Sequence, residues 1–416
     1  MDEKYEKVKE ILKKYNQEQL LIWYDKLIEQ KKEELLDQIL KIDFDQIEEL
    51  YQETKGKKDF KDCKVEPLSY IDKQKIPAEE RERYEKEGIK LIKEGKYAVV
   101  TMAGGQGTRL GHNGPKGTFE LEVGEKKPLF TLLAQTIKEA RDKYDAVIPW
   151  YIMTSRENNY KTTEFFKRHN YFDMGEENVK FFIQNELPMI DTQGKILVDE
   201  KGMVKEAADG HGGIFEAMRR EGITDEMEKR GIEWIFIAGV DNVLAKMVDP
   251  LLTGIAIDKN FLAAGKSVVK NNPKEKVGVF CKKNNKPSVI EYTEITDEMA
   301  EKVDENGELL YGESHILCNL FNIKAIEEIA KNKLPYHSAF KKAKYIDKNG
   351  VIVVPTEPNA YKFESFIFDA FEKLNDMAIL RVKREEEFAP VKNAEGVDSP
   401  ETASKLYKEY IKNKNK

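Results

Sequence analysis

The feature that most constrains this chain is an apolar run that breaks into glycines, KYAVVTMAGGQGTRLGHNGPKG at residues 96–117. The run from Tyr97 to Met102 is rich in β-branched and apolar residues, which predicts a buried strand. The glycines at 104–105 lack a Cβ, so their backbone N–H groups can turn toward a ligand. Arg109 and Lys116 add a guanidinium fork and a point charge. The stretch therefore predicts a strand followed by a phosphate-binding loop.

Two common phosphate-binding motifs are excluded by the residues at their defining positions. A P-loop requires Gly before its Lys and Ser or Thr after it, whereas Pro115 precedes Lys116 and Gly117 follows. A dinucleotide fingerprint that begins at Gly105 requires glycine where the chain has Leu110. A flexible surface turn is the remaining alternative, but it needs neither the buried strand nor the cations at these positions.

Charge and length limit the classes of partner. The 416 residues predict two or three domains, or one large α/β core with helical attachments. Lysine and arginine (69) are fewer than aspartate and glutamate (76), which gives a net charge of −7. We therefore expect no nucleic-acid or membrane partner, and any phosphate site must be local.

The cysteines and the amino terminus indicate the compartment. Cys63, Cys281 and Cys318 form no C-x-x-C pair, and an odd number argues against a disulfide framework. The chain starts with no signal-like apolar segment, and no run approaches the roughly 20 apolar residues of a membrane span. We expect a cytoplasmic protein whose Cys281 and Cys318 are buried and inert.

Helical and strand patterns alternate after the glycine loop. They fall at 128–144 (helix), 148–155 (strand), 158–172 (helix), 179–184 (strand), 213–223 (helix) and 234–242 (strand). This alternation predicts a doubly wound α/β sheet. In such sheets ligands bind beyond the carboxyl ends of the strands, so we expect the loops at 103–116, 184–191, 207–213 and 241–242 to gather there.

The flanking regions complete the predicted organisation. Residues 1–55 predict amphipathic helices interrupted near Asn16 and Asp43, which favours packing onto the core over a coiled coil with another chain. Residues 56–75 predict an extended connector, and 260–360 predict antiparallel strands on the side of the core where the second substrate would bind. Residues 361–374 predict an apolar helix, followed by a strand at 378–382 and a last helix from Pro400. The expected division is an N-terminal helical region at 1–95, a core at 96–385 and a C-terminal segment at 386–416.

Seven motifs together resemble a known family. AGGQGTRLG with PKG is followed in order by FFIQNELP, ADGHGG, FIAGVDN, VIEYTEI, YKFESFIFDAF and APVKNAEG, over roughly residues 95–395. This series resembles the UDPGP family of UTP-dependent uridylyltransferases, and within it the UDP-N-acetylhexosamine pyrophosphorylases. The resemblance implies a Rossmann-like mixed sheet of the nucleotide-diphospho-sugar transferase type. It also implies transfer of UMP from UTP to a sugar 1-phosphate, with N-acetylglucosamine 1-phosphate as the expected acceptor.

The chemistry of that transfer fits the residue types present. The attacking phosphate oxygen is already an anion, so the reaction needs no general base but must bring two highly charged molecules into line. Asp241 follows the apolar run 234–240, which places a carboxylate at the mouth of a buried strand. Mg²⁺ prefers oxygen ligands and takes one or two carboxylates plus substrate phosphates. Asp241 is therefore our candidate metal ligand, although an Asp in this position can also cap a turn.

The resemblance also implies roles for individual residues. The uridine would contact Met102, Ala103, Gly104, Gly105, Gln184 and Gly210. The phosphates and Mg²⁺ would be bound by Arg109, Lys116, Asp241 and Lys362. The sugar side would be formed by His211, Gly278, Glu291, Tyr292, His315 and Lys392, the last reaching in from the C-terminal segment.

Two positions depart from the N-acetylglucosamine branch, which has Asn where this chain has His211 and His315. An imidazole offers a different donor and acceptor pattern from an amide, so we expect a changed acetamido pocket. A UTP–glucose-1-phosphate uridylyltransferase is therefore an alternative, and so is a catalytically silent nucleotide-sugar-binding protein. A nicotinamide dehydrogenase is disfavoured by Leu110 and by the lack of an acidic ribose ligand. The sequence leaves the oligomeric state open.

Overall fold

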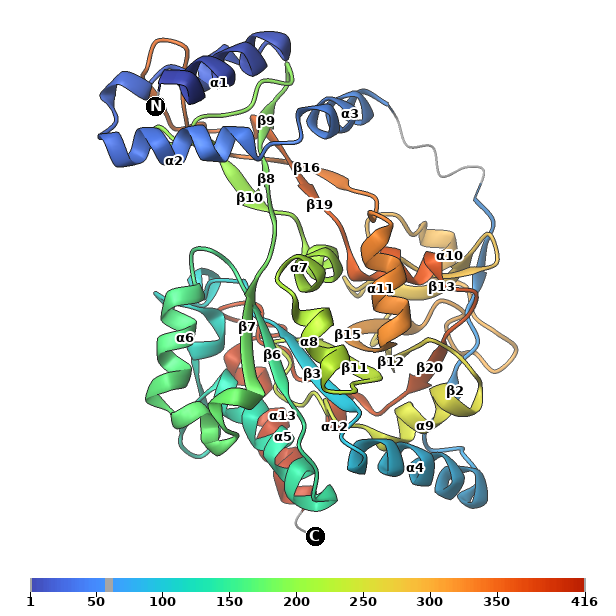
Figure 1. Ribbon diagram of the computed structural model, residues 1–416. Coiled ribbons are helices and arrows are strands. Elements are labelled where there is room, and N and C mark those ends of the chain that lie inside the picture. The colour runs from blue at the N-terminus through green and yellow to red at the C-terminus, as the bar shows by residue number, and fades with distance from the viewer. Residues whose placement is uncertain (1, 57–62, 415–416) are drawn as a thin grey trace. The chain divides into compact units, whose positions relative to one another are not determined.

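The computed structural model describes residues 2–56 and 63–414, which separate into two compact units (Figure 1). The chain passes between the units several times. The large unit comprises Cys63–Gln184, Ile214–Lys333 and Ile367–Lys416. The small unit comprises Met1–Asp62, Asn185–Gly213 and Leu334–Phe366.

A mixed sheet forms the centre of the large unit. Its main path runs in the order β2-β20-β12-β15-β11-β3-β6-β7. The strands are β2 (Ile71–Asp72), β3 (Tyr97–Met102), β6 (Trp150–Thr154), β7 (Val179–Ile183), β11 (Trp234–Gly239), β12 (Ala263–Val269), β15 (Glu313–Asn322) and β20 (Ala378–Arg381). Neighbours along this path pair in parallel except at β15, which is antiparallel to both β11 and β12.

A second group of strands attaches to β15. β13 (Val279–Lys283) pairs with β1 (Val65–Pro67), β14 (Lys286–Ile290) and β15, in each case antiparallel. β15 is irregular, because its register with β12 shifts between Gly265 and Ser267 and Leu317 has a φ of 56°. A side chain other than glycine rarely adopts that conformation, so the strand bulges at this point.

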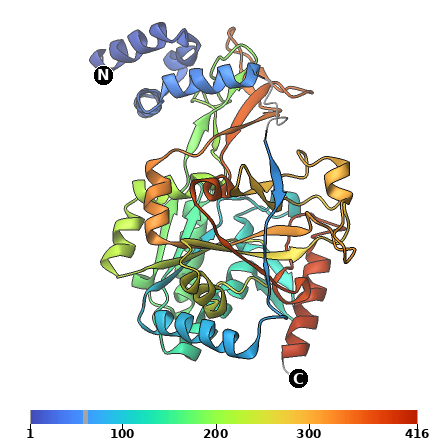
Figure 2. The same cartoon turned by 90° about the vertical axis from the view of Figure 1, so that its right-hand side faces the viewer.

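Helices cover both faces of the sheet because its central strands are buried throughout. One face packs against α4 (Ala78–Lys93), α5 (Leu129–Tyr144), α6 (Asn159–Arg168) and α9 (Pro250–Asp258). The other carries α7 (Ile214–Arg220), α8 (Ile223–Lys229) and α11 (Ile323–Lys331), which contact one another (Figure 1). Shorter pieces are β4 (Glu120–Glu122), β5 (Lys126–Pro128), α10 (Asp297–Glu301), the 3₁₀ helix η9 (Ile367–Lys373) and α12 (Arg384–Glu387). The last helix, α13 (Pro400–Lys414), packs beside β4 and is red in Figure 2.

The small unit combines helices with short strands around its own apolar core. Its helices are α1 (Asp2–Lys14), α2 (Glu29–Leu40) and α3 (Phe44–Lys55). Its strands are β8 (Glu186–Pro188), β9 (Ile190–Asp191), β10 (Glu206–Ala208), β16 (His337–Lys341), β17 (Tyr345–Ile346), β18 (Ile352–Val353) and β19 (Ala360–Glu364). Val8 and Leu36 of the helices are buried in one cluster with Ile190 and Phe363 of the strands.

The predicted α/β class is confirmed, and β3 has the predicted bounds of Tyr97–Met102. The predicted helix at 361–374 is wrong, because its first part forms strand β19 between β16 and β9 and its second part forms the 3₁₀ helix η9. Aromatic residues such as Tyr361 and Phe363 favour strands where a ladder is available on both sides. The antiparallel strands predicted over 260–360 are divided, with β13–β15 in the large unit and β16–β18 in the small unit.

The units also differ from the linear division at residues 95 and 385. The helices of residues 1–55 form one unit with segments 185–213 and 334–366, because those segments supply apolar residues that cover the helices. Asn16 has a φ of 55° and Asp43 caps α3 by accepting from the Gln46 N–H, which accounts for the predicted interruptions. Residues 57–62 of the predicted connector lie outside the described residues.

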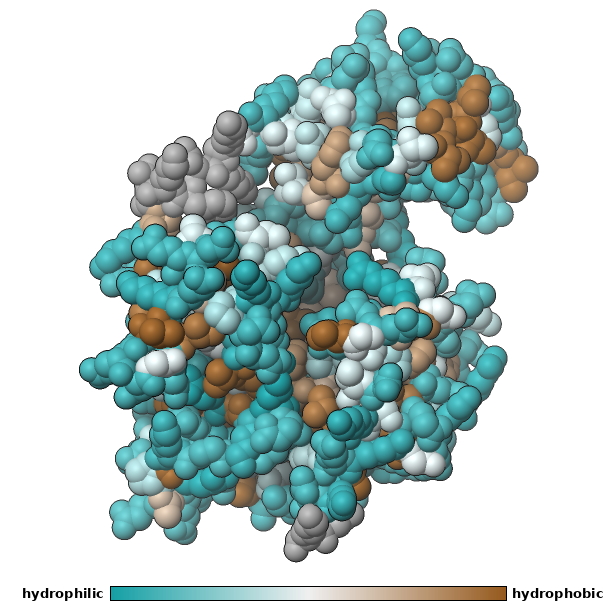
Figure 3. Space-filling model, turned by 180° about the vertical axis from the view of Figure 1, so that it is seen from behind, coloured by the Kyte–Doolittle hydropathy of each residue, from teal (hydrophilic) through white to brown (hydrophobic). Residues whose placement is uncertain are grey.

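Hydrophilic residues dominate the face shown in Figure 3, where apolar side chains form separate small groups. Within residues 2–56 and 63–414, none of the helices has the length and apolar character required to cross a bilayer.

Candidate active site

The winding of the large sheet reverses between β3 and β11. From β3 the chain continues outward through β6 and β7, and it then returns to place β11 on the opposite side of β3 (Figure 1). The loops that follow β3 and β11 therefore leave the same sheet edge in different directions. In open α/β sheets ligands bind at such a switch point, and here it brings the glycine loop and Asp241 together.

The glycine loop closes on itself and returns Lys116 to its starting point. The Lys116 N–H donates to the Gly105 carbonyl at 3.0 Å, and the Gly107 N–H donates to the Gly114 carbonyl at 2.9 Å. At the base of the loop, the Ala103 N–H donates to the Met153 carbonyl of β6 at 2.8 Å. The loop is thus a rigid cradle rather than a flexible turn.

The two predicted glycines have different surroundings. A Cβ on Gly104 would lie only 2.6–2.9 Å from the side-chain atoms of Gln184, so glycine lets the loop approach that carboxamide closely. A Cβ on Gly105 would have no atom within 4 Å. The backbone at Gly105 therefore faces open space, where a ligand can approach it. Met102 and Ala103, also predicted to contact uridine, are buried at the end of β3.

Asn158 is a site residue that sequence reasoning missed. Its side chain is fully buried, and Nδ2 donates to the Ala103 carbonyl at 2.8 Å and to the Gly105 carbonyl at 3.3 Å. Its Oδ1 accepts from the Ser155 N–H at 2.9 Å. An Asn just before a helix suggests only a helix cap. Its contact with a loop more than 50 residues away cannot be predicted from the residues around Asn158.

Lys116 and Asp241 form an ion pair across the switch point. The Lys116 Nζ lies 3.7 Å from Oδ2 of Asp241, and the two side chains are 18% and 22% exposed. Gly239 makes room for this carboxylate, because a Cβ there would lie 2.7 Å from Oδ1 of Asp241. The sequence therefore places a cation and an anion beside the open backbone of Gly105.

The Asp241 carboxylate fits the role of a metal ligand. A separation of 3.7 Å is longer than a charge-assisted hydrogen bond, so the carboxylate keeps acceptor capacity for another ligand. Mg²⁺ commonly binds one carboxylate together with substrate phosphates and water, so a second protein carboxylate is not required. Asp241 with a bound nucleotide could hold such an ion.

Three residues predicted for the sugar side lie together beside β15. The His315 N–H donates to the Gly278 carbonyl at 2.8 Å, and a Cβ on Gly278 would lie 3.0 Å from Oε1 of Glu291. The His315 ring contacts Oδ1 of Asn319 through Nε2 at 3.1 Å. It also meets the aromatic ring of Phe280 edge-on, at 5.1 Å between centroids. These contacts hold the imidazole in one orientation.

Three other predicted residues of the large unit are more exposed. Tyr292 is 45% exposed and lines a small cavity of about 200 Å³ with Lys270 and Glu275. Lys392 lies 3.5 Å from the Asp398 carboxylate. Arg109 is exposed in the 3₁₀ turn Thr108–Leu110.

Gly210, His211 and Lys362 belong to the small unit, where they surround the end of β19. Gly210 has a φ of 86°, and a Cβ there would lie 2.3 Å from the Ser365 carbonyl oxygen. The His211 ring lies 5.4 Å from the Phe366 ring, and Lys362 pairs with Glu364 at 2.6 Å. The loop after β10 and the strand β19 therefore form one local arrangement.

The buried cysteines are unreactive, as expected. Burial raises the pKa of Cys281 and of Cys318 to about 12. Only the thiolate is a strong nucleophile, so neither residue suits covalent catalysis.

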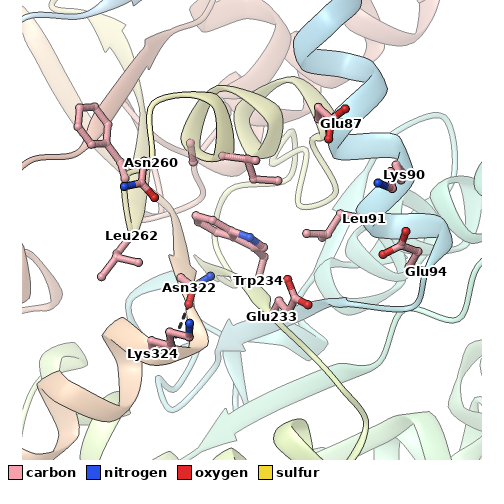
Figure 4. Close-up of a pocket in the computed structure, with 13 residues that line it drawn as sticks. Glu87, Lys90, Leu91, Glu94, Glu233, Trp234, Asn260, Leu262, Asn322 and Lys324 are labelled. Atoms are coloured by element: carbon pink, nitrogen blue, oxygen red, sulfur yellow. Dashed lines mark hydrogen bonds between the residues drawn. The ribbon is translucent and has the colours of Figure 1, made fainter.

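A cavity of about 350 Å³ lies at the opposite end of β11 (Figure 4). Trp234, which begins β11, lines it together with Glu87, Asn322 and Lys324. Val240 follows Trp234 by six positions along the strand direction, so this cavity is roughly 20 Å from the Lys116–Asp241 pair. It contains none of the predicted site residues.

Comparison with known proteins identifies the family. A profile of the UTP–glucose-1-phosphate uridylyltransferase (UDPGP) family matches residues 41–409. The chain is 39% identical over 336 residues to human UDP-N-acetylhexosamine pyrophosphorylase-like protein 1, covering 78% of this chain and 66% of the human protein. It is 36% identical over 421 residues to UDP-N-acetylglucosamine diphosphorylase 2 of Arabidopsis thaliana, covering 95% and 82%. The chain thus spans about two thirds of the human relative's length.

Solved structures agree with this result. The UDP-N-acetylglucosamine pyrophosphorylase of Trypanosoma brucei, solved with an inhibitor, matches with a TM-score of 0.83 and 29% identity, covering 98% of this chain and 84% of that one. A UDP-glucose pyrophosphorylase of Leishmania major shares the fold, with a TM-score of 0.65 and 16% identity over 84% of this chain and 72% of that one. The predicted membership is confirmed, and the chain belongs to the UDPGP family of uridylyltransferases.

Proposed function

We propose that this chain transfers UMP from UTP to a sugar 1-phosphate and releases pyrophosphate. The observation that carries the proposal is the Lys116–Asp241 pair beside the open backbone of Gly105, at the switch point of the sheet. The family membership and the names of the relatives support the same reaction.

In the proposed reaction an oxygen of the sugar phosphate attacks the α-phosphorus of UTP. The new P–O bond forms as the bond to the β-phosphate oxygen breaks, and pyrophosphate leaves with the electron pair. The nucleophile is already an anion, so the residues supply position and positive charge instead of a base. Lys116, Arg109 and the glycine-loop N–H groups would bind the phosphates of UTP, and Lys362 and Lys392 would add charge.

We also propose that Mg²⁺ is the cofactor and that Asp241 and the nucleotide phosphates hold it. When bound, the ion would neutralise charge on the phosphates. Asp241 would fix the position of this charge, because it lies two residues after the end of the buried strand β11.

N-acetylglucosamine 1-phosphate is the proposed acceptor, since several relatives are named for that sugar. Glucose 1-phosphate is the second candidate, because His211 and His315 stand at positions where the N-acetylglucosamine branch has Asn. A cytoplasmic location is proposed as well, because Cys63, Cys281 and Cys318 are all free thiols, as is usual in a reducing compartment.

The test is an assay of pyrophosphate release with UTP, Mg²⁺ and three acceptors: the 1-phosphates of N-acetylglucosamine, N-acetylgalactosamine and glucose. Release with the first, and a UDP-sugar of matching mass, is expected. UDP-sugar binding with no release for any acceptor would instead support a silent binding protein. Asp258→Asn is the matched control for the site variant Asp241→Asn, because Asp258 pairs with Arg83 at the surface of the large unit.

A further inference from the structure

Asn242, next to the candidate metal ligand, connects two distant segments of the large unit. Its side chain is 3% exposed. Nδ2 donates to the Glu387 carbonyl at 2.8 Å, and Oδ1 accepts from the Ala389 N–H at 2.9 Å. One carboxamide thus satisfies two backbone groups of a segment that lies about 145 residues further along the chain.

Backbone hydrogen bonds extend this connection on both sides. The Val243 N–H donates to the Ala389 carbonyl at 3.2 Å, and the Val391 N–H donates to the Asp241 carbonyl at 3.0 Å. Lys392 follows Val391 directly. The backbone that carries this lysine is therefore attached to the residue that carries the candidate metal-binding carboxylate.

Buried charges anchor the same segment from its other end. The Glu387 carboxylate is 2.6 Å from Nζ of Lys266 and 2.7 Å from Nζ of Lys73. Lys266 is fully buried and also pairs with Asp249 at 2.7 Å. The C-terminal segment 387–392 is therefore held by a dry ionic cluster at one end and by Asn242 and Asp241 along its length.

We infer that Asn242 is a positioning residue that fixes Lys392 relative to Asp241. The inference rests on the proposed function, in which these two side chains act on the same phosphates. The Lys392 ammonium is exposed and lies 3.5 Å from the Asp398 carboxylate, and the Lys392 N–H donates to the Asp398 carbonyl at 2.6 Å. These contacts join Lys392 to its own C-terminal segment and not to Asp241. Asn242 touches neither Lys392 nor the Asp241 carboxylate, and it acts through the backbone of residues 387–391.

Asn242→Ala tests the inference. We expect kcat to fall roughly ten- to hundredfold with little change in the KM for UTP, because a cation is displaced while the glycine loop stays intact. In the double variant with Lys392→Ala, kcat should match that of the slower single variant within about twofold. Multiplication of the two effects, or normal turnover in Lys392→Ala, would overturn the inference.

Asn178→Ala is the matched control for a merely structural effect. Asn178 is also buried and donates to the Met174 carbonyl at 2.9 Å, but it lies before β7, at the amino edge of the sheet. It should reduce stability as much as Asn242→Ala does and leave kcat unchanged. An equal loss of kcat in both variants would contradict a positioning role.

Hydrogen exchange of the wild-type protein tests the same connection without a variant. The Ala389 and Val391 amides should exchange as slowly as the Ile237 amide in β11, and at least 100-fold more slowly than the exposed Lys412 amide. Rapid exchange would overturn the inference. Absence of pyrophosphate release by the wild type would contradict the proposed function instead, and this exchange measurement would still decide whether Asn242 anchors the segment.

Discussion

Two pairs of lysine and carboxylate in the large unit differ in their access to water. Lys116 and Asp241 are about one-fifth exposed and 3.7 Å apart. Lys266 and Glu387 are 0% and 1% exposed and 2.6 Å apart. Lys116 and Asp241 can exchange each other for phosphates and a metal ion at a modest cost in free energy, because water already reaches them. Lys266 and Glu387 are buried away from water, and their charges are already paired. The same residue types therefore serve ligand binding at the strand ends and stability inside the fold.

The largest expected effect concerns the buried pair, Lys266 and Glu387. Lys266→Met leaves the Asp249 carboxylate buried without its ion-pair partner and removes one of the cations beside Glu387, so stability should fall by about 3–5 kcal/mol. Urea unfolding measures the change. Lys75→Met is the control, because Lys75 is exposed and should lose less than about 1 kcal/mol. Equal losses in both variants would remove the distinction between the two environments.

The solvent-accessible pair, Lys116 and Asp241, should affect turnover far more than stability. Lys116→Ala and Asp241→Asn should each lower kcat roughly 100- to 1000-fold, because each removes charge that stabilises the transition state. Their unfolding free energies should stay within about 1 kcal/mol of the wild type. Steady-state kinetics and urea unfolding on the same samples test both statements. Wild-type turnover in either variant would remove that residue from the site.

Low pH should reduce the loss of unfolding free energy that Lys266→Met causes. Burial alone raises the pKa of Asp249 and of Glu387, but Lys266 and Lys73 together outweigh it and hold both pKa values below the usual 3.8 and 4.5. Wild-type stability from these groups is therefore present above about pH 4.5 and is lost as pH falls through the lowered values. In Lys266→Met the strongest of these positive charges is lost, so burial acts more strongly against the charged carboxylates and protonation should stabilise the variant. The stability gap measured at pH 7 should narrow by about 1 kcal/mol or more at pH 4; a constant gap would contradict this assignment.

The smallest expected effect concerns Asn158, whose side chain donates to backbone carbonyls of the glycine loop. Asn158→Ala removes the donors to the Ala103 and Gly105 carbonyls, so the KM for UTP should rise about three- to tenfold, equivalent to about 1 kcal/mol. Asn178→Ala again serves as the control and should leave this KM unchanged. A wild-type KM in Asn158→Ala would mean that the loop keeps its shape unaided.

Local patterns predicted the parts of the fold that depend on neighbours in sequence. The strand at Tyr97–Met102 and the carboxylate after β11 follow from apolar runs and the residues that end them. The segment 361–374 was misjudged, because its apolar residues suit a helix in isolation and a strand once β16 and β9 are available. Pairing with β16 and β9 therefore decided in favour of a strand for the first part of this segment.

Long-range contacts account for what sequence reasoning missed. The Asn158 contact with the glycine loop and the Asn242 contact with residues 387–389 join segments distant in the chain. The small unit likewise assembles from three separated segments. The roles of the individual site residues remain predictions, whereas the meeting of Gly105, Lys116 and Asp241 at the switch point follows from the strand order.

The most direct measurement is calorimetric titration of UTP into the wild type and Asp241→Asn, with and without Mg²⁺. If Asp241 and the nucleotide hold the ion together, Mg²⁺ should tighten UTP binding at least roughly tenfold in the wild type and less than about twofold in the variant. An equal effect of Mg²⁺ on both proteins would contradict a metal site at Asp241.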